Sequence, residues 1–377
     1  MKKSFAILCS LLLLTSCGGS STTTADDGAP VVRLDPYRRG TIRTADFVDS
    51  VEYLILESTP ESMIRRIDRL CVMDSLLLVA DYASRSVFIF DREGRYRSRV
   101  SRIGRSREEY VSMNVVAFDT LRSEVLVHDI MTEKLLVYGL DGTCRSVAED
   151  FGRNTGYACT RYPRDMQALA SGNVICYEFL HGSDRDNRDG LWEMTRQGEF
   201  VRWIRQFDFV HPSEGSGNRL TWMDGGRIAW FPIETNDDFA FDGNSLRRVV
   251  SYDVAGPTVR DYVGLPDPLF ITAHPGTFFA ARLMTQIKGR FVFTYWIDEK
   301  FDTFYTLYDR ERRSLTAGDP GGSFTQLKPP AKGVVEVFGG SPYLTKKKIK
   351  TASTWVQPPR CTIKAGTTTN RSHQQYS

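Results

Sequence analysis

Three chemically active side chains stand at the ends of two short apolar runs. Asp81 follows LLLVA, and Asp129 follows EVLVH, so that His128 lies directly before it. Carboxylates from several chain segments can hold Ca²⁺, which takes about six to eight oxygen ligands, and a histidine can act as a general base. An aspartate after a strand also accepts hydrogen bonds from the backbone of the next turn. Both interpretations stay open for Asp81 and Asp129, and the pattern favours the turn cap.

Other spacings typical of a reactive centre are missing from the sequence. The five histidines show no H-x-H or H-E-x-x-H spacing, and neither C-x-x-C nor G-x-S-x-G occurs. His128 has no nucleophile beside it in the sequence, which favours a buried histidine over a catalytic one. The loop HGSDRDNRDG (181–190) is similar to a calcium loop but lacks the glycine and glutamate of an EF-hand. We therefore assign no catalytic residue and no metal ligand, and calcium is the only cofactor kept open.

The elements that position these residues form a repeat. Residues 76–98 align without a gap to residues 124–146, at an offset of 48. Looser copies of the strand, turn and strand pattern follow at 190–204, 245–263 and 302–318. The equivalent positions are Phe90, Tyr138, Met194, Tyr252 and Tyr308, separated by steps of 48, 56, 58 and 56 residues.

Units of this length with four short β-branched and aromatic strands are typical of propeller blades. The sequence therefore predicts an all-β protein, a β-propeller of six blades with four antiparallel strands each, and seven blades as the alternative. Residues 47–59 and 65–74 precede the first copy, and they are expected to contribute to a further blade closed by strands from the far end of the chain. Asp81 and Asp129 then fall at equivalent places in successive blades.

The two ends of the chain differ from this body. Residues 1–16 are typical of a signal peptide, and LLTSC at 13–17 matches the site of a lipid-bearing cysteine, Cys17. Residues 17–40 have the composition of a flexible tether, and the propeller is expected over 41–318. Residues 319–377 form an atypical basic tail, which we interpret as disordered or as the product of a shifted reading frame rather than as a functional basic arm.

Charge and cysteines exclude some classes of protein. The net charge of +3 includes +2 from residues 1–16 and +7 from the tail, which leaves −6 for the body, with its charges interspersed. A nucleic-acid partner is not expected, because it needs a clustered basic face. Cys159 and Cys176 could form a disulfide across a hairpin, and two buried thiols are the favoured alternative.

The stretch VADYASRSVFIFDREG (79–94) resembles the NHL-type repeat. The segment DSVEYLILE (49–57) and the element GRSREEY (104–110) resemble motifs of the six-bladed β-propeller lipoproteins of Bacteroidetes. The resemblance covers roughly residues 47–318, and it implies a lipid anchor in the cell envelope, at the outer membrane. The second element departs from the family's glycine- and proline-rich form, so its loop is expected to differ.

This resemblance implies a binding or scaffolding module for a glycan, peptide or protein partner, held on the membrane through its lipid. The alternative is a calcium-dependent hydrolase or lyase, because related propeller enzymes hold calcium in their central channel. The candidate channel or ligand residues are then Asp81, His128 and Asp129. An enzyme is the less favoured of the two expectations, since the sequence shows no coherent catalytic set.

Overall fold

The computed structural model describes residues 28–42, 54–178, 190–206, 220–222, 226–230, 232, 235–262, 279–287, 290–297 and 303–319. In these residues the chain is all-β, apart from the short 3-10 helices η2 (Ala158–Arg161) and η4 (Val259–Tyr262). The predicted fold class is thus confirmed at the level of an all-β protein built from sheets of mostly four antiparallel strands.

Five sheets follow one another along the chain. Sheet 1 holds β3 (Arg69–Val72), β4 (Leu76–Asp81), β5 (Ser86–Asp91) and β6 (Tyr96–Val100). Sheet 2 holds β7 (Val115–Asp119), β8 (Glu124–Asp129), β9 (Lys134–Gly139) and β10 (Cys144–Ala148). Sheet 3 holds β11 (Asp165–Ala168), β12 (Val174–Glu178), β13 (Gly190–Met194) and β14 (Phe200–Gln206).

Sheets 4 and 5 each have a fifth strand from the N-terminal part of the chain. Sheet 4 holds β15 (Leu220–Trp222), β16 (Ile228–Trp230), β17 (Asp237–Phe241) and β18 (Leu246–Val254), and β1 (Val31–Leu34) pairs parallel to β18. Sheet 5 holds β19 (Phe279–Ile287), β20 (Phe291–Ile297), β21 (Thr303–Asp309) and β22 (Ser314–Asp319), and β2 (Gly40–Thr41) pairs parallel to β22.

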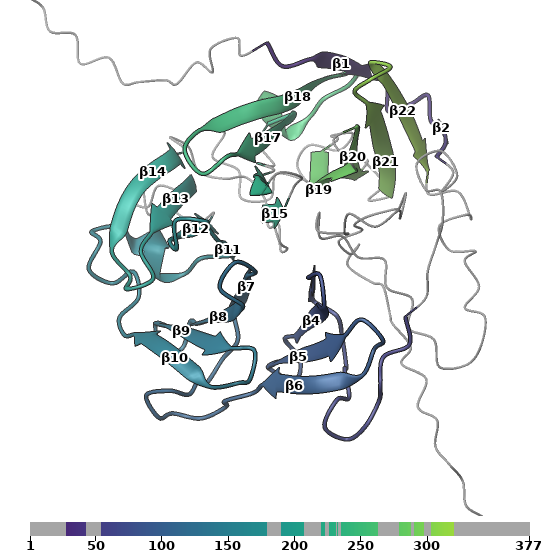
Figure 1. Cartoon of the computed structure of the whole chain (residues 1–377). Helices are drawn as coiled ribbons and strands as arrows, with labels where there is room; N and C mark the ends of the chain where they lie inside the picture. The colour runs from purple at the N-terminus through teal and green to yellow at the C-terminus, as the bar shows by residue number, and fades with distance from the viewer. Residues whose placement is uncertain are drawn as a thin grey trace, which may run out of the picture.

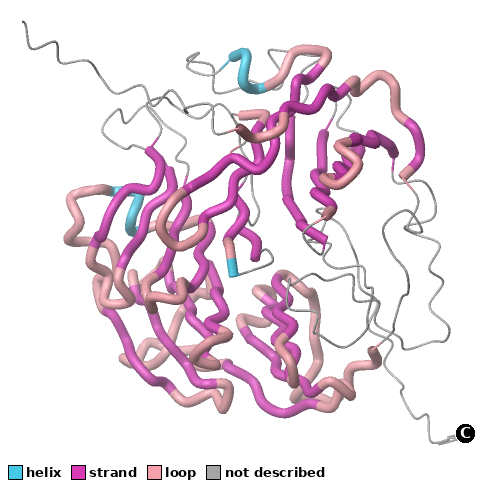
Figure 2. The backbone as a smooth tube through the Cα atoms, turned by 45° about the horizontal axis from the view of Figure 1, so that its top comes forward, coloured by secondary structure: helices cyan, strands magenta, loops and turns pink. Residues whose placement is uncertain are grey.

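The sheets lie side by side around a common centre, with the first strand of a sheet inside and its fourth strand outside (Figures 1 and 2). Each interface between neighbouring sheets is a separate apolar core. Ile89 and Val127 pack between sheets 1 and 2, and Trp192 packs between sheets 2 and 3. Trp230 packs between sheets 3 and 4, and Trp296 packs between sheets 4 and 5. The second and third strands of sheets 1 and 2 therefore bury side chains on both of their faces, which explains their nearly continuous apolar sequences, whereas the outer strands β6, β10 and β14 are largely half-buried or exposed.

The repeat predicted from the sequence is present in the strand register. Leu76 pairs with Asp91 in sheet 1, and Glu124 pairs with Gly139 in sheet 2, which is 48 residues further on in both strands. A short apolar run, a four-residue turn and a second apolar run thus build the same hairpin twice. The described residues contain five such sheets.

The antiparallel order gives the molecule two unlike ends. In sheets 1 to 3, the turns between first and second strands and between third and fourth strands lie at one end, and each contains three to five residues. We name this end the turn face. The turns 82–85 and 130–133 between second and third strands lie at the other end, together with the connections 101–114 and 149–164 from one sheet to the next. We name this end the loop face.

Several expectations for the chain ends and the cysteines can be compared with the structure. Part of the expected tether (17–40) is instead strand, because Val32 and Leu34 of β1 are buried in the core of sheets 4 and 5. The signal peptide, Cys17 and the tail beyond Asp319 lie outside the described residues. Cys159 and Cys176 are both buried free thiols, so the favoured alternative to the disulfide is confirmed.

A buried acid between sheets 4 and 5 makes stability depend on pH. Asp238 accepts hydrogen bonds from Tyr252 Oη (3.0 Å) and Thr294 Oγ1 (3.1 Å). Burial raises the pKa of Asp238 to about 8, although these two hydrogen bonds act in the opposite direction. The folded protein therefore holds a proton that the unfolded chain releases near pH 4, so stability falls as pH rises from about 4 to about 8.

We expect Asp238→Asn to remove this loss of folding stability at high pH. Between pH 6 and pH 9 the melting temperature of the wild-type protein should fall by about 5 °C more than that of the variant, measured by thermal unfolding. Asp242→Asn is the control, since hydrogen bonds from the backbone N–H groups of Ser245 and Asn244 lower the pKa of this exposed turn residue. Parallel melting curves for wild type and Asp238→Asn over this pH range would contradict the prediction.

Candidate functional site

The innermost strands meet in a polar cluster at the centre of the molecule. We define this central cluster as Asp68, Arg69, Tyr82, Asp165 and Gln167. Arg69 begins β3, Asp165 begins β11, and both strands start at the loop face. The cluster therefore lies where the first strands of different sheets approach one another.

One guanidinium group joins four sheets at this point. Arg69, in sheet 1, donates from Nη1 to the carbonyl oxygens of Val116 in sheet 2 and Met166 in sheet 3. Its Nη2 lies 3.4 Å from the carbonyl oxygen of Leu220 in sheet 4 and 2.8 Å from Oδ1 of Asp165. The Arg69 and Asp165 side chains are 7% and 0% exposed. This is a buried ion pair whose donors are directed at backbone carbonyls of three neighbouring strands.

The carboxylate of the pair is equally well bonded. Asp165 accepts hydrogen bonds from the backbone N–H groups of Met166 and Leu220, both at 2.8 Å. Gln167 donates from Nε2 to the carbonyl oxygen of Leu220 at 3.2 Å. A charge pair in a low-dielectric interior is tolerated when hydrogen bonds replace the lost water, as they do here. The arrangement is that of a structural centre.

The central cluster reaches solvent at its loop-face edge. Asp68 accepts a hydrogen bond from the backbone N–H of Tyr82 at 2.7 Å and pairs with the exposed Arg66 at 2.5 Å. Burial raises the pKa of Asp68, against the effects of the Tyr82 N–H group and Arg66. Arg164 pairs with the buried Glu178 at 3.1 Å on the neighbouring part of sheet 3. Arginine–carboxylate pairs thus line the loop-face side of the centre.

The two aspartates singled out by the sequence cap turns on the loop face. Asp81 accepts hydrogen bonds from the backbone N–H groups of Ala83 (3.0 Å) and Ser84 (3.2 Å) in the turn after β4. Its other oxygen accepts the N–H of Arg65 at 2.8 Å, in the segment that leads into β3. The carboxylate therefore fastens the turn after the second strand to the segment before the first strand.

Asp129 repeats this arrangement in sheet 2. It accepts hydrogen bonds from the N–H groups of Met131 (3.0 Å) and Val111 (2.7 Å) and from the hydroxyl of Thr132 (2.7 Å). Burial alone would raise the pKa of Asp129, but these bonds together with those from Ser112 outweigh it and lower the pKa. The turn-cap interpretation of both aspartates is confirmed. Each carboxylate binds within its own sheet, and the structure does not bring the two together.

His128 lies away from the centre. Its side chain is fully buried between sheets 2 and 3, with its ring centroid 5.6 Å from that of Phe151. Neither ring nitrogen has a hydrogen bond of normal geometry within the described part of the chain. Burial lowers the pKa of His128 to about 4, although the carboxylate of Asp129 opposes the shift. The structure therefore places a neutral imidazole in the core, where the sequence had suggested a channel residue.

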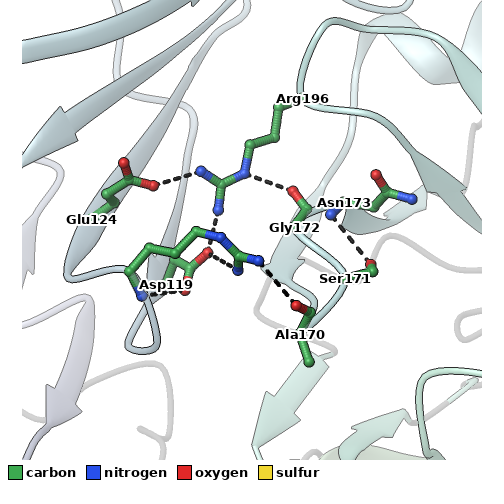
Figure 3. Close-up of polar contacts among 8 residues, drawn as sticks. Asp119, Glu124, Ala170, Ser171, Gly172, Asn173 and Arg196 are labelled. Atoms are coloured by element: carbon green, nitrogen blue, oxygen red, sulfur yellow. Dashed lines mark hydrogen bonds and ion pairs between the residues drawn. The ribbon is translucent and has the colours of Figure 1, made fainter.

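A second charged cluster, on the turn face, escaped the sequence analysis (Figure 3). Arg196 of sheet 3 pairs with Asp119 and with Glu124 of sheet 2, the latter at 2.5 Å, and donates to the carbonyl oxygen of Gly172 at 2.6 Å. Arg122 binds the same Asp119 and reaches the carbonyl oxygen of Ala170. Arg196 lies 72 positions after Glu124 and 77 positions after Asp119, so no local spacing could reveal that it joins them. They join the turns of two neighbouring sheets.

Among the residues that the structure describes, no three His, Cys, Asp or Glu side chains gather closely enough to hold a metal ion. In the same residues, no helix is both long and apolar enough to cross a membrane.

The comparisons with known proteins identify the family. Residues 31–328 match the model of a domain of unknown function, DUF4934, and the chain belongs to this family. The match begins at the first residue of β1, in agreement with the place of this strand in sheet 4. The search of the curated proteins finds no match.

Two of the solved structures that are similar to this chain come from Bacteroides. BF0058, an exported-protein candidate of Bacteroides fragilis NCTC 9343, has a TM-score of 0.62 at 12% identity, and the match covers 82% of this chain and 84% of that chain. A DUF4221 family member of Bacteroides vulgatus ATCC 8482 has a TM-score of 0.49 at 8% identity, covering 71% and 85%. The first likeness shows a shared fold.

The Arg69–Asp165 pair should dominate stability. Arg69→Ala or Asp165→Ala leaves an uncompensated buried charge, so each should lower the free energy of unfolding by about 3–5 kcal/mol in a denaturant titration. Arg66→Ala removes the half-exposed ion pair with Asp68, and it should change the free energy of unfolding by less than about 1 kcal/mol. The double variant Arg69→Met/Asp165→Leu should be more stable than either single variant. The prediction fails if Arg69→Ala is no more harmful than Arg66→Ala.

His128 should make the protein sensitive to mild acid. Its folded pKa of about 4 lies below the usual value of 6.5, so its contribution is complete above about pH 6.5 and is lost as pH falls towards 4. From pH 7 to pH 5 the loss should be about 2 kcal/mol, and His128→Leu should not show it. Denaturant titrations at both pH values measure the difference. The acids near His128 are Asp129 and Glu133. An equal loss of stability in wild type and His128→Leu would show that groups other than His128, such as these acids, carry the acid effect.

Proposed function

We propose that this chain is a lipid-anchored β-propeller of the cell envelope that binds a glycan, peptide or protein partner on its loop face. The family has no assigned activity, and the envelope location is supported by the exported-protein neighbour and by the signal-like N-terminus. The lipid at Cys17 and the outer-membrane location are part of this proposal. A calcium-dependent hydrolase or lyase with its site in the central channel is the competing function that the experiment below must exclude.

The propeller is supported by a contact that recurs in front of sheet 1, where the segment 54–57 takes the place of a preceding sheet. A Cβ atom on Gly142 would lie 2.8 Å from the carbonyl oxygen of Arg99 in the outer strand of the preceding sheet. A Cβ atom on Gly94 would collide with the carbonyl oxygen of Ile55, and the N–H of Glu57 donates to the carbonyl of Gly94 at 2.8 Å. Residues 54–57 thus stand where the outer strand of a blade before sheet 1 would stand, which favours six blades.

The observation that carries the binding proposal is the difference between the two faces. The turn face consists of turns of three to five residues and of ion pairs between sheets, which serve the scaffold. The loop face carries the long connections between sheets. Binding residues are found disproportionately on loops held by a rigid framework, because loops can change without loss of the core. A ligand is therefore expected at the loop face.

The sequence-derived candidates support binding more than catalysis. Asp81 and Asp129 direct their oxygens at backbone N–H groups of their own turns, and His128 is buried. Arg69 donates to the backbone carbonyl of Met166, and Asp165 accepts from the backbone N–H of Leu220, so both members of the pair are bonded to neighbouring strands. A calcium-dependent enzyme would need several of these oxygens to converge on one ion.

Exposed side chains at opposite ends of sheet 2 can be used to test whether the ligand binds at the loop face. Met131 is 69% exposed in a loop-face turn, and Leu121 is 71% exposed in a turn-face turn. The full chain is first screened on glycan and peptide arrays. Binding to the ligand found there should fall about tenfold or more when Met131, Ile103 and Tyr157 of the loop face are changed to arginine, and Leu121→Arg should leave it unchanged.

Two results would overturn the proposal. One is loss of binding in Leu121→Arg with retention in the loop-face variant. The other is a requirement for calcium, shown by a chelator that abolishes binding or lowers the melting temperature of the full chain, together with turnover of the bound glycan or peptide. The second result would establish the competing enzymatic function.

A further inference from the structure

A buried histidine lies beneath one connection of the loop face. His128 lies near the end of β8 and faces sheet 3, because Leu126, two residues earlier on the same strand face, belongs to the core between sheets 2 and 3. The His128 side chain is fully buried, and its ring centroid lies 5.6 Å from that of Phe151. Phe151 belongs to the connection 149–164 between sheets 2 and 3, so this connection covers the imidazole. We name residues 149–164 the cover.

The cover is held by separate contacts. The N–H of Phe151 donates to the carbonyl oxygen of Glu133 at 2.6 Å, and Arg153 pairs with the carboxylate of Glu133 at 2.8 Å. The hydroxyl of Thr160 donates to the carbonyl oxygen of Gly152 at 2.7 Å, which joins the two halves of the cover. The strands beneath are instead joined by continuous backbone ladders. Segments held by isolated contacts open at a lower free-energy cost than ladder strands.

The surroundings of His128 keep its ring neutral at neutral pH. Burial lowers the pKa of His128 to about 4, although the carboxylate of Asp129, the backbone carbonyl of Arg161 and the carboxylate of Glu133 favour the charged ring. Asp129 is bonded to the N–H groups of its own turn, and Glu133 is paired with an arginine of the cover. In the same core, burial raises the pKa of the Cys176 thiol well above its usual value, so this thiol is uncharged in acid. A protonated His128 therefore needs water, which a closed cover keeps out.

We propose that the cover acts as an acid-sensitive gate on the loop face, which opens as a unit when His128 takes up a proton. Opening hydrates the imidazolium while the strands of sheets 2 and 3 stay paired. In the open form the ring has an ordinary pKa of about 6.5, so it binds the proton more tightly than in the closed form. The closed form is therefore fully favoured above about pH 6.5, and opening becomes easier as pH falls towards 4.

Opening also changes the face that we propose as the binding surface. Tyr157 lies on the cover, and its side chain is 38% exposed. Its ring packs against Phe200 and Trp203 of β14, with centroid distances of 5.0 and 5.1 Å. Opening separates these rings, so a ligand that contacts Tyr157 should be released in acid. This last consequence rests on the proposed function, whereas opening of the cover does not.

Hydrogen exchange of the full chain measures the opening without any ligand. The reporters are the amides of Phe151, Thr160 and Tyr162, whose N–H groups donate to backbone carbonyls. After correction for the intrinsic pH dependence of exchange, their protection should fall about twentyfold from pH 7 to pH 5. This is the ratio for one proton bound with a pKa of about 6.5 in the open form and about 4 in the closed form. The amides of β9 should stay more protected than the cover at both pH values.

Variants of His128 test whether this side chain carries the effect. His128→Leu and His128→Gln each place an uncharged side chain under the cover, so the cover should lose its pH dependence in either variant that folds. Asp141→Asn is the matched control, because Asp141 is a titratable residue of the same sheet in an exposed turn on the turn face. This control should keep the twentyfold change. A pH dependence that persists in the His128 variants would overturn the proposal.

Urea distinguishes opening of the cover from unfolding of the whole chain. Opening of a short segment exposes little surface, so protection of the cover should change little in urea below the unfolding transition, while protection of β9 falls steeply. Equal protection and equal urea dependence in the cover and in β9 would overturn the proposal, because both then exchange through global unfolding. If neither His128 variant folds, the wild type decides, since unchanged protection of the cover between pH 7 and pH 5 also overturns it.

Discussion

The buried ion pair between Arg69 and Asp165 is the contact on which the arrangement of the first four sheets depends. A charged guanidinium is stable without water only where its donors meet acceptors, and here the acceptors are one carboxylate and the backbone carbonyls of three other sheets. The innermost strands must therefore keep a fixed distance from Arg69. The apolar cores between sheets are not directional, so they permit small shifts that this pair does not.

Polar residues on the two faces also hold neighbouring elements together through directed hydrogen bonds and ion pairs. On the loop face, Asp81 and Asp129 bind the turn that follows them and the segment that leads into their sheet. On the turn face, Arg196 and Arg122 meet at Asp119 and connect sheets 2 and 3. Side chains that could serve catalysis elsewhere are here occupied by backbone groups of the scaffold.

A scaffold held in this way suits a protein that presents long connections to a partner. The core between two sheets does not depend on the length of the connection that joins them, so the loop face can vary while the strands stay in place. A fold shared with an exported protein of Bacteroides at 12% identity fits the view that the framework persists while its loops differ.

Much of the architecture is determined by the sequence alone. Apolar runs separated by short turns, repeated at an offset of 48, specify antiparallel hairpins of one register, because strand pairing and turn chemistry are local. The turn-cap role of Asp81 and Asp129 follows from the same local pattern.

The tertiary structure decided what depends on partners far apart in the chain. The pairing of Arg69 with Asp165, 96 positions later, the strand formed by residues 31–34 within the expected tether, and the burial of His128 each need a neighbour from another sheet. A single sequence carries no signal for such neighbours, because the free energy of these contacts arises only when the sheets have come together.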